Sequence, residues 1–141
     1  MTAYDPGNIF AKILRGEIPS HKIYEDEDTF AFMDVMPQGT GHTLVIPKTP
    51  SRNILDADPA TLAKLIPVVQ KIAVAAKDAF EADGVTVIQF NEPASGQTIY
   101  HLHFHVIPRF EGVPLRPHSG SMEDQGVLSA NAQKMRDALA T

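Results

Sequence analysis

The pattern of apolar and polar positions predicts a short helix near the N-terminus and a long helix in the middle of the chain. Apolar residues at helical spacing over 9–14 predict a short helix that Asp5 caps and Gly16 ends. The longest helical pattern begins at Asp58, and Pro67 within it is expected to cause a kink or to move its start. The predicted apolar face of this helix consists of Leu62, Leu65, Ile66, Val69, Ile72, Ala73, Ala76 and Phe80.

Strand patterns fill most of the remaining sequence. Turn-forming residues 91–96 separate the last two strand patterns, 112–126 looks irregular, and 128–139 predicts a final helix. Strands and helices without a βαβ alternation favour an α+β domain with a mainly antiparallel sheet. We expect one domain over 1–141, with a core over about 8–110 and a tail over 111–141. The predicted strands cover residues 23–24, 29–34, 42–46, 85–90 and 99–108, and Pro47 is expected to end the third.

Composition restricts the possible partners. The net charge is −5 and no basic run occurs, which disfavours nucleic acid and anionic membranes as partners. The absence of Cys excludes disulfides and thiolate metal ligands, and it fits a reducing compartment. We see no leader pattern, and no apolar stretch approaches the roughly 20 residues of a membrane span. We therefore expect a cytoplasmic protein that contacts neither nucleic acid nor membrane.

Three histidines at alternate positions are the strongest chemical signal. His101, His103 and His105 alternate with apolar residues over 100–107. In a strand this places the three rings on one face and the apolar side chains on the other, against the long helix. Successive rings would stand about 7 Å apart, close enough for adjacent histidines to contact one phosphate.

Three interpretations of this pattern are open from the residues alone. Imidazoles on one face can bind a metal ion, although no Asp, Glu or Cys lies close in sequence to complete the ligand set. The histidines can also form a solvated polar face without a role. The third interpretation is covalent catalysis, in which a neutral imidazole attacks phosphorus. This chemistry needs a hydrogen bond at the other ring nitrogen, which a backbone carbonyl of the same strand can accept. It requires no metal and no cofactor, and we expect neither.

At this point the sequence resembles the histidine triad (HIT) family, whose signature is His-x-His-x-His followed by two apolar residues. The likeness runs from about Ile9 to Pro108 and is nearest to the Hint-like branch. It implies an α+β fold with a five-stranded antiparallel sheet and two main helices, in a homodimer joined by the long helix and a strand edge. The segments that carry it are IFAKILRGEIPSHKIYEDED, AFMDVMPQGTGHTLVIPK and NEPASGQTIYHLHFHV.

The resemblance implies a role for each histidine of the triad. His103 matches the nucleophile that takes the nucleoside monophosphate as a covalent intermediate. His101 matches the residue whose backbone carbonyl orients the nucleophile, and His105 matches a donor to the phosphate oxygens. His42 matches a fourth histidine that sits against the triad and supports it. Some relatives bind zinc through N-terminal Cys and His residues, but here only His21 lies in that region, so we expect no structural zinc.

The same resemblance implies a nucleotide pocket. Thr98 stands where a Ser often donates toward the leaving group, and Asp34 matches the carboxylate that accepts the ribose hydroxyls. From the residues alone, Asp34 could equally form a turn, and residues 9–13 could be an ordinary amphipathic helix face. The loop around the α-phosphate is matched by Asn91, Gly96, Gln97 and Thr98. The apolar slot for a purine is matched by Ile9, Phe10, Ile13, Ile18 and Phe32.

The implied reaction is hydrolysis of a purine nucleoside phosphoramidate to a nucleoside 5′-monophosphate and an amine. Three alternatives stay open. A dinucleoside polyphosphate hydrolase of the Fhit branch uses the same triad. A nucleotidylyl transferase of the galactose-1-phosphate type usually lacks the third histidine, which His105 supplies here. The protein can also act chiefly as a nucleotide-binding or scaffolding partner with slow turnover.

Overall fold

A five-stranded antiparallel sheet forms the centre of the computed structural model, which describes residues 3–118 and 121–141. The strands lie in the order β1-β2-β3-β5-β4, so β4 and β1 are the edges. This arrangement confirms the α+β class and the five-stranded antiparallel sheet. The strands are β1 (Lys22–Glu25), β2 (Thr29–Met33), β3 (Thr43–Pro47), β4 (Gly84–Ile88) and β5 (Phe104–Arg109).

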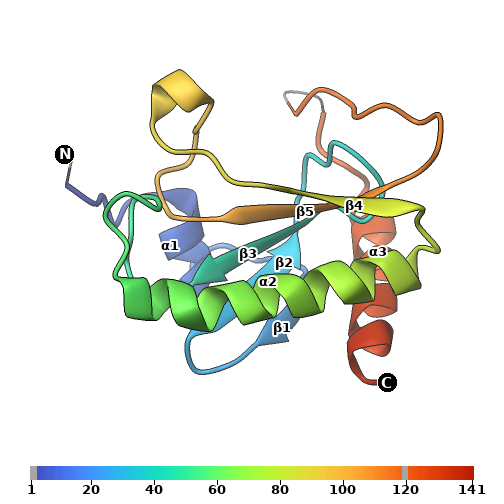
Figure 1. Cartoon of the computed structure of the whole chain (residues 1–141), viewed down its shortest axis with the longest axis horizontal. Coiled ribbons are helices and arrows are strands. Elements are labelled where there is room, and N and C mark those ends of the chain that lie inside the picture. Colours follow the sequence, from blue (N-terminus) through green and yellow to red (C-terminus); the bar gives the residue numbers. More distant parts are fainter. Residues whose placement is uncertain (1–2, 119–120) are drawn as a thin grey trace.

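Within residues 3–118 and 121–141, two long helices and one short one accompany the sheet. They are α2 (Pro59–Ala79), α3 (Gln125–Leu139) and α1 (Ile9–Leu14). A single 3₁₀ turn, η1 (Pro93–Ser95), lies in the connection between β4 and β5. Figure 1 shows α2 running along the sheet and α3 crossing near the C-terminal end of α2.

The helix caps agree with the sequence for α2 but not for α1. Asp58 caps α2, and its carboxylate accepts a hydrogen bond from the backbone N–H of Ala60. The prediction that Asp5 caps α1 is wrong, because Asn8 accepts from the N–H of Ala11 instead. Asp5 accepts from the N–H of Gly7 and so closes the turn before the helix.

The inward face of α2 differs from the predicted one. Ile66 was placed on the apolar face, yet it is 46% exposed. The helix continues through Pro67, which lies on the exposed side, where water can hydrate the carbonyl that proline leaves unbonded. The buried residues of α2 are Leu65, Val68, Val69, Ile72, Ala75 and Ala76.

The length and composition of α2 would also suit a membrane span, contrary to the expectation from the sequence. In the structure its buried side packs on the sheet together with α3, in one apolar cluster. Such packing is typical of the core helix of a globular domain, which meets the same criteria of length and composition.

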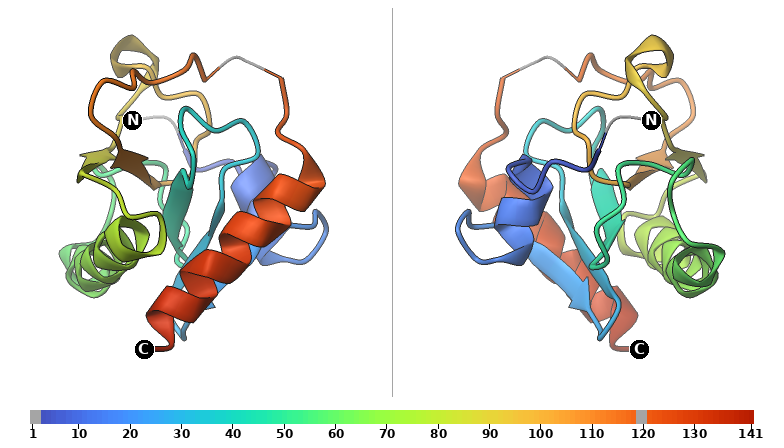
Figure 2. Two further views of the ribbon diagram at one scale, coloured as in Figure 1. Left: turned by 90° about the vertical axis from the view of Figure 1, so that its right-hand side faces the viewer. Right: turned by 90° about the vertical axis from the view of Figure 1, so that its left-hand side faces the viewer.

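The sheet has two differently covered faces. Ala31 of β2 belongs to the cluster under α2 and α3, whereas Phe30 and Phe32 belong to a second cluster that contains Phe10 of α1. This alternation follows from the two-residue period of a strand. Figure 2 shows α1 and α2 on opposite sides of the strands. The small cluster on the α1 side forms the base of the candidate site.

The strand that carries the histidines is shorter than predicted. We expected it over 99–108, but it begins at Phe104. The register pairs Val45 with Phe104, so the next hydrogen-bonded pair along the two strands would be Pro47 with Leu102. Proline has no N–H to donate, so this pair cannot complete the ladder. The N–H of Leu102 instead donates to the carbonyl oxygen of Ser51, at 2.8 Å. Only His105 of the triad therefore lies in the paired part of β5, although Leu102 still packs in the core under α2, as expected.

Candidate active site

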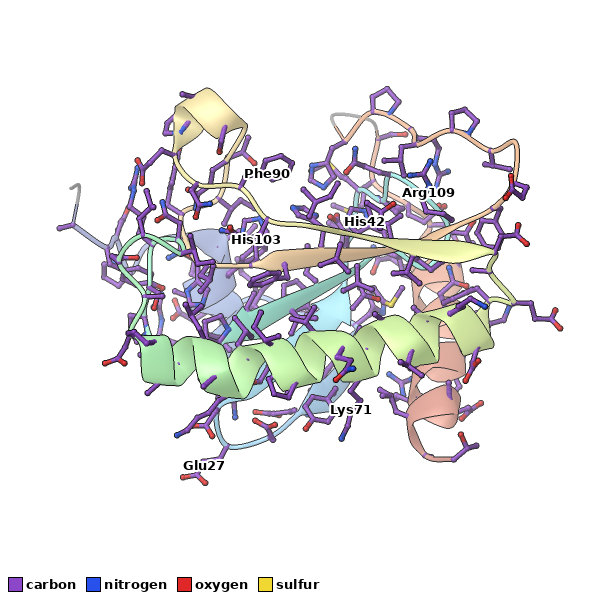
Figure 3. All side chains as sticks on the ribbon, in the orientation of Figure 1. Glu27, His42, Lys71, Phe90, His103 and Arg109 are labelled. Atoms are coloured by element: carbon purple, nitrogen blue, oxygen red, sulfur yellow. The ribbon has the colours of Figure 1, made fainter. Side chains whose placement is uncertain are left out.

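A cavity of about 560 Å³ opens on the α1 side of the sheet. His103 and His105 line it, together with residues of α1, β2 and β3, the loop over 96–99 and the C-terminal segment. Figure 3 shows His103 near β5, and Phe90 above it in the connection that carries η1. All predicted residues of the purine slot line this cavity, namely Ile9, Phe10, Ile13, Ile18 and Phe32.

The ring of His103 is held neutral and in one tautomer. Its Nδ1 lies 2.7 Å from the carbonyl oxygen of His101. A carbonyl can only accept, so Nδ1 carries the proton and Nε2 keeps its lone pair. Burial lowers the pKa of His103 below its usual range, which favours the neutral ring. A neutral imidazole with a free Nε2 is the form in which histidine acts as a nucleophile.

A chain of hydrogen bonds also fixes the ring of His105. The backbone N–H of Gln38 donates to Nδ1 of His42, at 3.0 Å, so the proton of His42 sits on Nε2. That Nε2 donates to Nδ1 of His105, at 2.9 Å, which leaves the proton of His105 on its own Nε2. Burial lowers the pKa of His42 to about 4 and the pKa of His105 to about 3, so both rings are neutral. His105 is thereby prepared to donate from Nε2.

The position of His42 depends on the glycine before it. Gly41 adopts a φ of 82°, and a Cβ there would lie 2.6 Å from a ring carbon of Phe80. Any side chain at position 41 would therefore push Phe80, at the end of α2, away from the sheet. The close approach sets where β3 begins and hence where His42 meets His105.

His101 contributes its backbone to the site, not its ring. Its Nε2 donates to the carbonyl oxygen of Pro47, at 2.8 Å, and the hydroxyl of Tyr4 donates to its Nδ1, at 2.6 Å. The ring is fully buried, and burial lowers the pKa of His101 to about 4. The expectation that all three rings share one phosphate-facing side is thus wrong for His101, because the chain leaves regular strand geometry before Phe104.

A buried polar network holds the loop after β4. The carboxylate of Glu92, at a φ of 72°, accepts from Arg52 at 2.8 and 3.0 Å. The side chain of Gln97 accepts from the N–H of Glu92 and donates to the carbonyl oxygen of Arg52. Gln97 lines the cavity, but its amide is occupied by these internal bonds. The sequence did not identify Arg52, whose pairing with Glu92 arises only in the fold.

The other predicted loop residues divide into two groups. Gly96 and Thr98 line the cavity, and Gly96 adopts a φ of 108°. Asn91 does not line it; its side chain accepts from the N–H of Ile54 and bonds Gln89. Asn91 therefore anchors the loop to the segment before α2.

Asp34 lies at the edge of the cavity with both oxygens engaged. Only 4% of the residue is exposed. Oδ1 accepts from the N–H of Met36 at 2.9 Å, and Oδ2 accepts from Nε2 of His118 at 2.7 Å. Burial acts to raise the pKa of Asp34, but the hydrogen bond from His118 and the nearby His42 outweigh it, so the pKa is lowered. Sequence reasoning missed His118, because nothing in the irregular tail pointed to Asp34.

Asp34, His42 and His105 lie close enough together to suggest a metal site. One ligand-type atom from each lies within 4.8 Å of the others. Both ring nitrogens of His42 already take part in hydrogen bonds, and Nδ1 of His105 accepts one of them. An ion at this place would have to break these bonds, so the three side chains fit a hydrogen-bonded support of the cavity better than a ligand set.

Comparison with known proteins settles the family. The sequence model of the HIT domain matches residues 15–112. The chain belongs to the HIT family. Its sequence is 43% identical over 102 residues to Protein hit of Bacillus subtilis, covering 72% of this chain and 70% of that protein. It is 36% identical over 105 residues to adenosine 5′-monophosphoramidase HNT1 of Candida albicans, covering 72% of this chain and 69% of that protein.

A solved HIT structure extends the likeness to nearly the whole chain. The crystal structure of a Hit-like protein involved in cell-cycle regulation from Bartonella henselae, with an unknown ligand, is 60% identical in sequence. It superposes with a TM-score of 0.91, covering 96% of this chain and 99% of that one. The HIT domain match itself ends at Gly112, so His118, Met122 and Gln125 of the cavity wall lie beyond it.

Proposed function

We propose that this HIT-family nucleotide hydrolase cleaves purine nucleoside phosphoramidates to a nucleoside 5′-monophosphate and an amine. The observation that carries the proposal is the state of His103, a buried neutral ring whose Nδ1–H is bound to the His101 carbonyl. Its Nε2 therefore has a lone pair beside a cavity large enough for a mononucleotide.

In the proposed first step, Nε2 of His103 attacks the α-phosphorus. A P–N bond forms between Nε2 and phosphorus while the P–N bond to the amine breaks, and the leaving amine takes a proton from solvent. Nε2–H of His105 donates to a non-bridging oxygen as charge develops on it. Thr98 lines the cavity, and its hydroxyl is proposed to donate toward the leaving group.

In the proposed second step, water attacks the phosphorus of the nucleotidyl-histidine. The P–Nε2 bond breaks, the monophosphate is released, the proton that the attacking water loses passes to solvent, and His103 returns to its neutral state. Because the His101 carbonyl binds Nδ1–H throughout, it stabilises the positive charge that the ring carries as the intermediate. The histidine hydrogen bonds thus support both halves of the reaction.

The nucleoside is proposed to lie with its base in the apolar slot. Phe10 and Phe32 meet edge to face there, with ring centroids 5.4 Å apart, and offer apolar surface to a purine. The ribose would then lie near Asp34. The phosphoramidase activity named for the Candida albicans relative favours a P–N substrate over a dinucleoside polyphosphate.

We also propose that the protein is a homodimer. Ile66 and Val74 on α2 are 46% and 60% exposed, and Val87 on the edge strand β4 is 46% exposed. Exposed apolar side chains on one helix and an adjoining sheet edge fit an interface between two copies. Analytical ultracentrifugation should give twice the mass of the chain, and Val74→Glu should shift it to monomer; a monomeric wild-type protein would refute this part.

Turnover of a substrate panel tests the reaction. Adenosine and guanosine phosphoramidates should be cleaved with kcat/KM at least about tenfold above that for diadenosine polyphosphates. Rapid acid or base quenching followed by mass spectrometry should find the nucleotidyl group on the peptide that contains His103. A preference for the polyphosphates would favour the alternative hydrolase, and kcat values orders of magnitude below about 1 s⁻¹ on every compound would favour a binding role.

A further inference from the structure

The C-terminal segment supplies one wall of the cavity. His118, Met122 and Gln125 line it, and all three lie beyond the range 15–112 that matches the HIT domain. His118 bonds a residue of the site directly, because its Nε2 donates to Oδ2 of Asp34 at 2.7 Å. Its ring centroid is 5.9 Å from that of His105 and 5.8 Å from that of His42. The segment therefore adds His118 to the histidines His21, His103 and His105 that line the cavity.

The charge of the cavity presents a difficulty for an anionic ligand. Among the described residues that line it, none is Lys or Arg, and Asp34 contributes a carboxylate. His103 and His105 are held neutral, as shown above. Without another group, a phosphate would enter a largely apolar cavity that carries a negative charge.

We propose that His118 is a specificity-determining residue that gives this cavity its preference for the phosphate-bearing form of the ligand. The proposal rests on the proposed function, because it assigns the phosphate to the same cavity. As an imidazolium, His118 neutralises Asp34 and presents positive charge beside His105, the predicted donor to the phosphate. Asp34 in turn holds the ring in place by a charge-assisted hydrogen bond.

The surroundings of His118 agree with a protonated ring. The hydrogen bond to Asp34 raises the pKa of His118, and its partial burial opposes this less strongly. The titratable groups around it are Asp34 at the end of β2, His42 before β3, and His103 and His105 of the triad. Of these, only Asp34 carries charge near neutral pH, so the field at His118 favours the cation.

Binding of AMP and adenosine by titration calorimetry at pH 7 tests the proposal. In His118→Gln the affinity for AMP should fall about tenfold, while adenosine, which has no phosphate, should change by less than about twofold. His118→Lys restores a cation and should keep AMP within about threefold of wild type. The matched control is Arg116→Gln, which removes a cation from the same segment outside this cavity and should leave the AMP-to-adenosine ratio unchanged.

A purely structural role of His118 predicts a different result. AMP and adenosine would then weaken together, and Lys would fail as badly as Gln; either outcome overturns the proposal. An unchanged ratio in His118→Gln also overturns it. Proton NMR titration gives an independent check, because the pKa of His118 should lie above 6.5 and fall in Asp34→Asn. Absence of turnover and of the His103 intermediate in the wild-type protein would refute the proposed function instead, and it would leave these binding ratios intact.

Discussion

The Nδ1 atom of His103 lies 2.7 Å from the carbonyl oxygen of His101, two residues earlier in the chain. The bond is local, so the backbone next to the nucleophile also decides that Nδ1 of His103, and not Nε2, carries the proton. His105 is held in the opposite tautomer, with its proton on Nε2, through His42, which is 63 residues away in sequence. One ring is thereby prepared to attack and the next to donate.

Replacing His103 by Asn should abolish turnover of adenosine phosphoramidate. Binding depends on the cavity wall and chemistry depends on the ring, so the affinity for AMP should stay within about tenfold of wild type. Steady-state kinetics and titration calorimetry measure the two effects separately. If the variant kept a tenth of the wild-type kcat, His103 would not be the nucleophile.

Replacing His101 by Ala should affect stability more than chemistry. The substitution leaves the buried carbonyl of Pro47 without its donor and removes the partner of Tyr4, which should lower the free energy of unfolding by about 1–3 kcal/mol. The backbone carbonyl that orients His103 is retained, so kcat should stay within about tenfold of wild type. Urea denaturation and kinetics on the same preparation test both parts, and a loss of kcat as large as that of the His103 variant would contradict the division of roles.

Replacing Asp34 by Asn should reduce discrimination between ribose and deoxyribose. If the carboxylate accepts ribose hydroxyls, the substitution should cost about 1–3 kcal/mol in AMP affinity and little in dAMP affinity. Oδ1 already accepts from the N–H of Met36 and Oδ2 from His118, so each oxygen has one lone pair left for a ribose hydroxyl. Titration calorimetry with AMP and dAMP decides it: the same AMP-to-dAMP ratio in both proteins would rule out the ribose assignment.

Acid should destabilise the protein between pH 6.5 and about 4. The pKa values of His42 and His101 are lowered to about 4 by burial, whereas in the unfolded chain they return to about 6.5. Above pH 6.5 these rings are neutral in both states. Below it the unfolded chain takes up protons that the folded chain does not, so the free energy of unfolding falls. The raised pKa of His118 acts in the opposite sense. The stability that protonated His118 contributes is present at low pH and is lost as pH rises through the raised pKa.

Urea denaturation at pH 7.5, 6 and 5 measures this dependence. His42→Asn removes one of the buried rings, so its stability should fall less steeply with acid than that of the wild type. A free energy of unfolding that does not change between pH 7.5 and 5 would contradict the neutral state of these rings.

Excess EDTA should leave the proposed activity intact. A histidine nucleophile needs no ion, whereas a metal-activated water is lost with its metal. Elemental analysis of the purified protein should find no stoichiometric metal. One equivalent of tightly bound zinc, with activity that follows its removal and return, would restore the metal interpretation of Asp34, His42 and His105.

The sequence by itself determined the features that depend on near neighbours in the chain. Asp58 before Pro59 predicted the start of α2, and alternation along 101–106 correctly placed Leu102 and its apolar neighbours in the core under that helix. The bond between His103 and the His101 carbonyl is of the same local kind, since it spans two residues. Such features follow from short-range geometry and from the spacing of residue types.

The tertiary structure alone decided the features that join distant segments. Pro47 ends the pairing of β3 with the histidine segment, and the buried ring of His101 bonds the carbonyl oxygen of Pro47 and does not line the cavity. Asp34 and His118 are 84 residues apart, and they meet only because the C-terminal segment returns over the sheet. Spacing along the chain carries no information about such contacts, because they depend on how the sheet, helices and tail pack together.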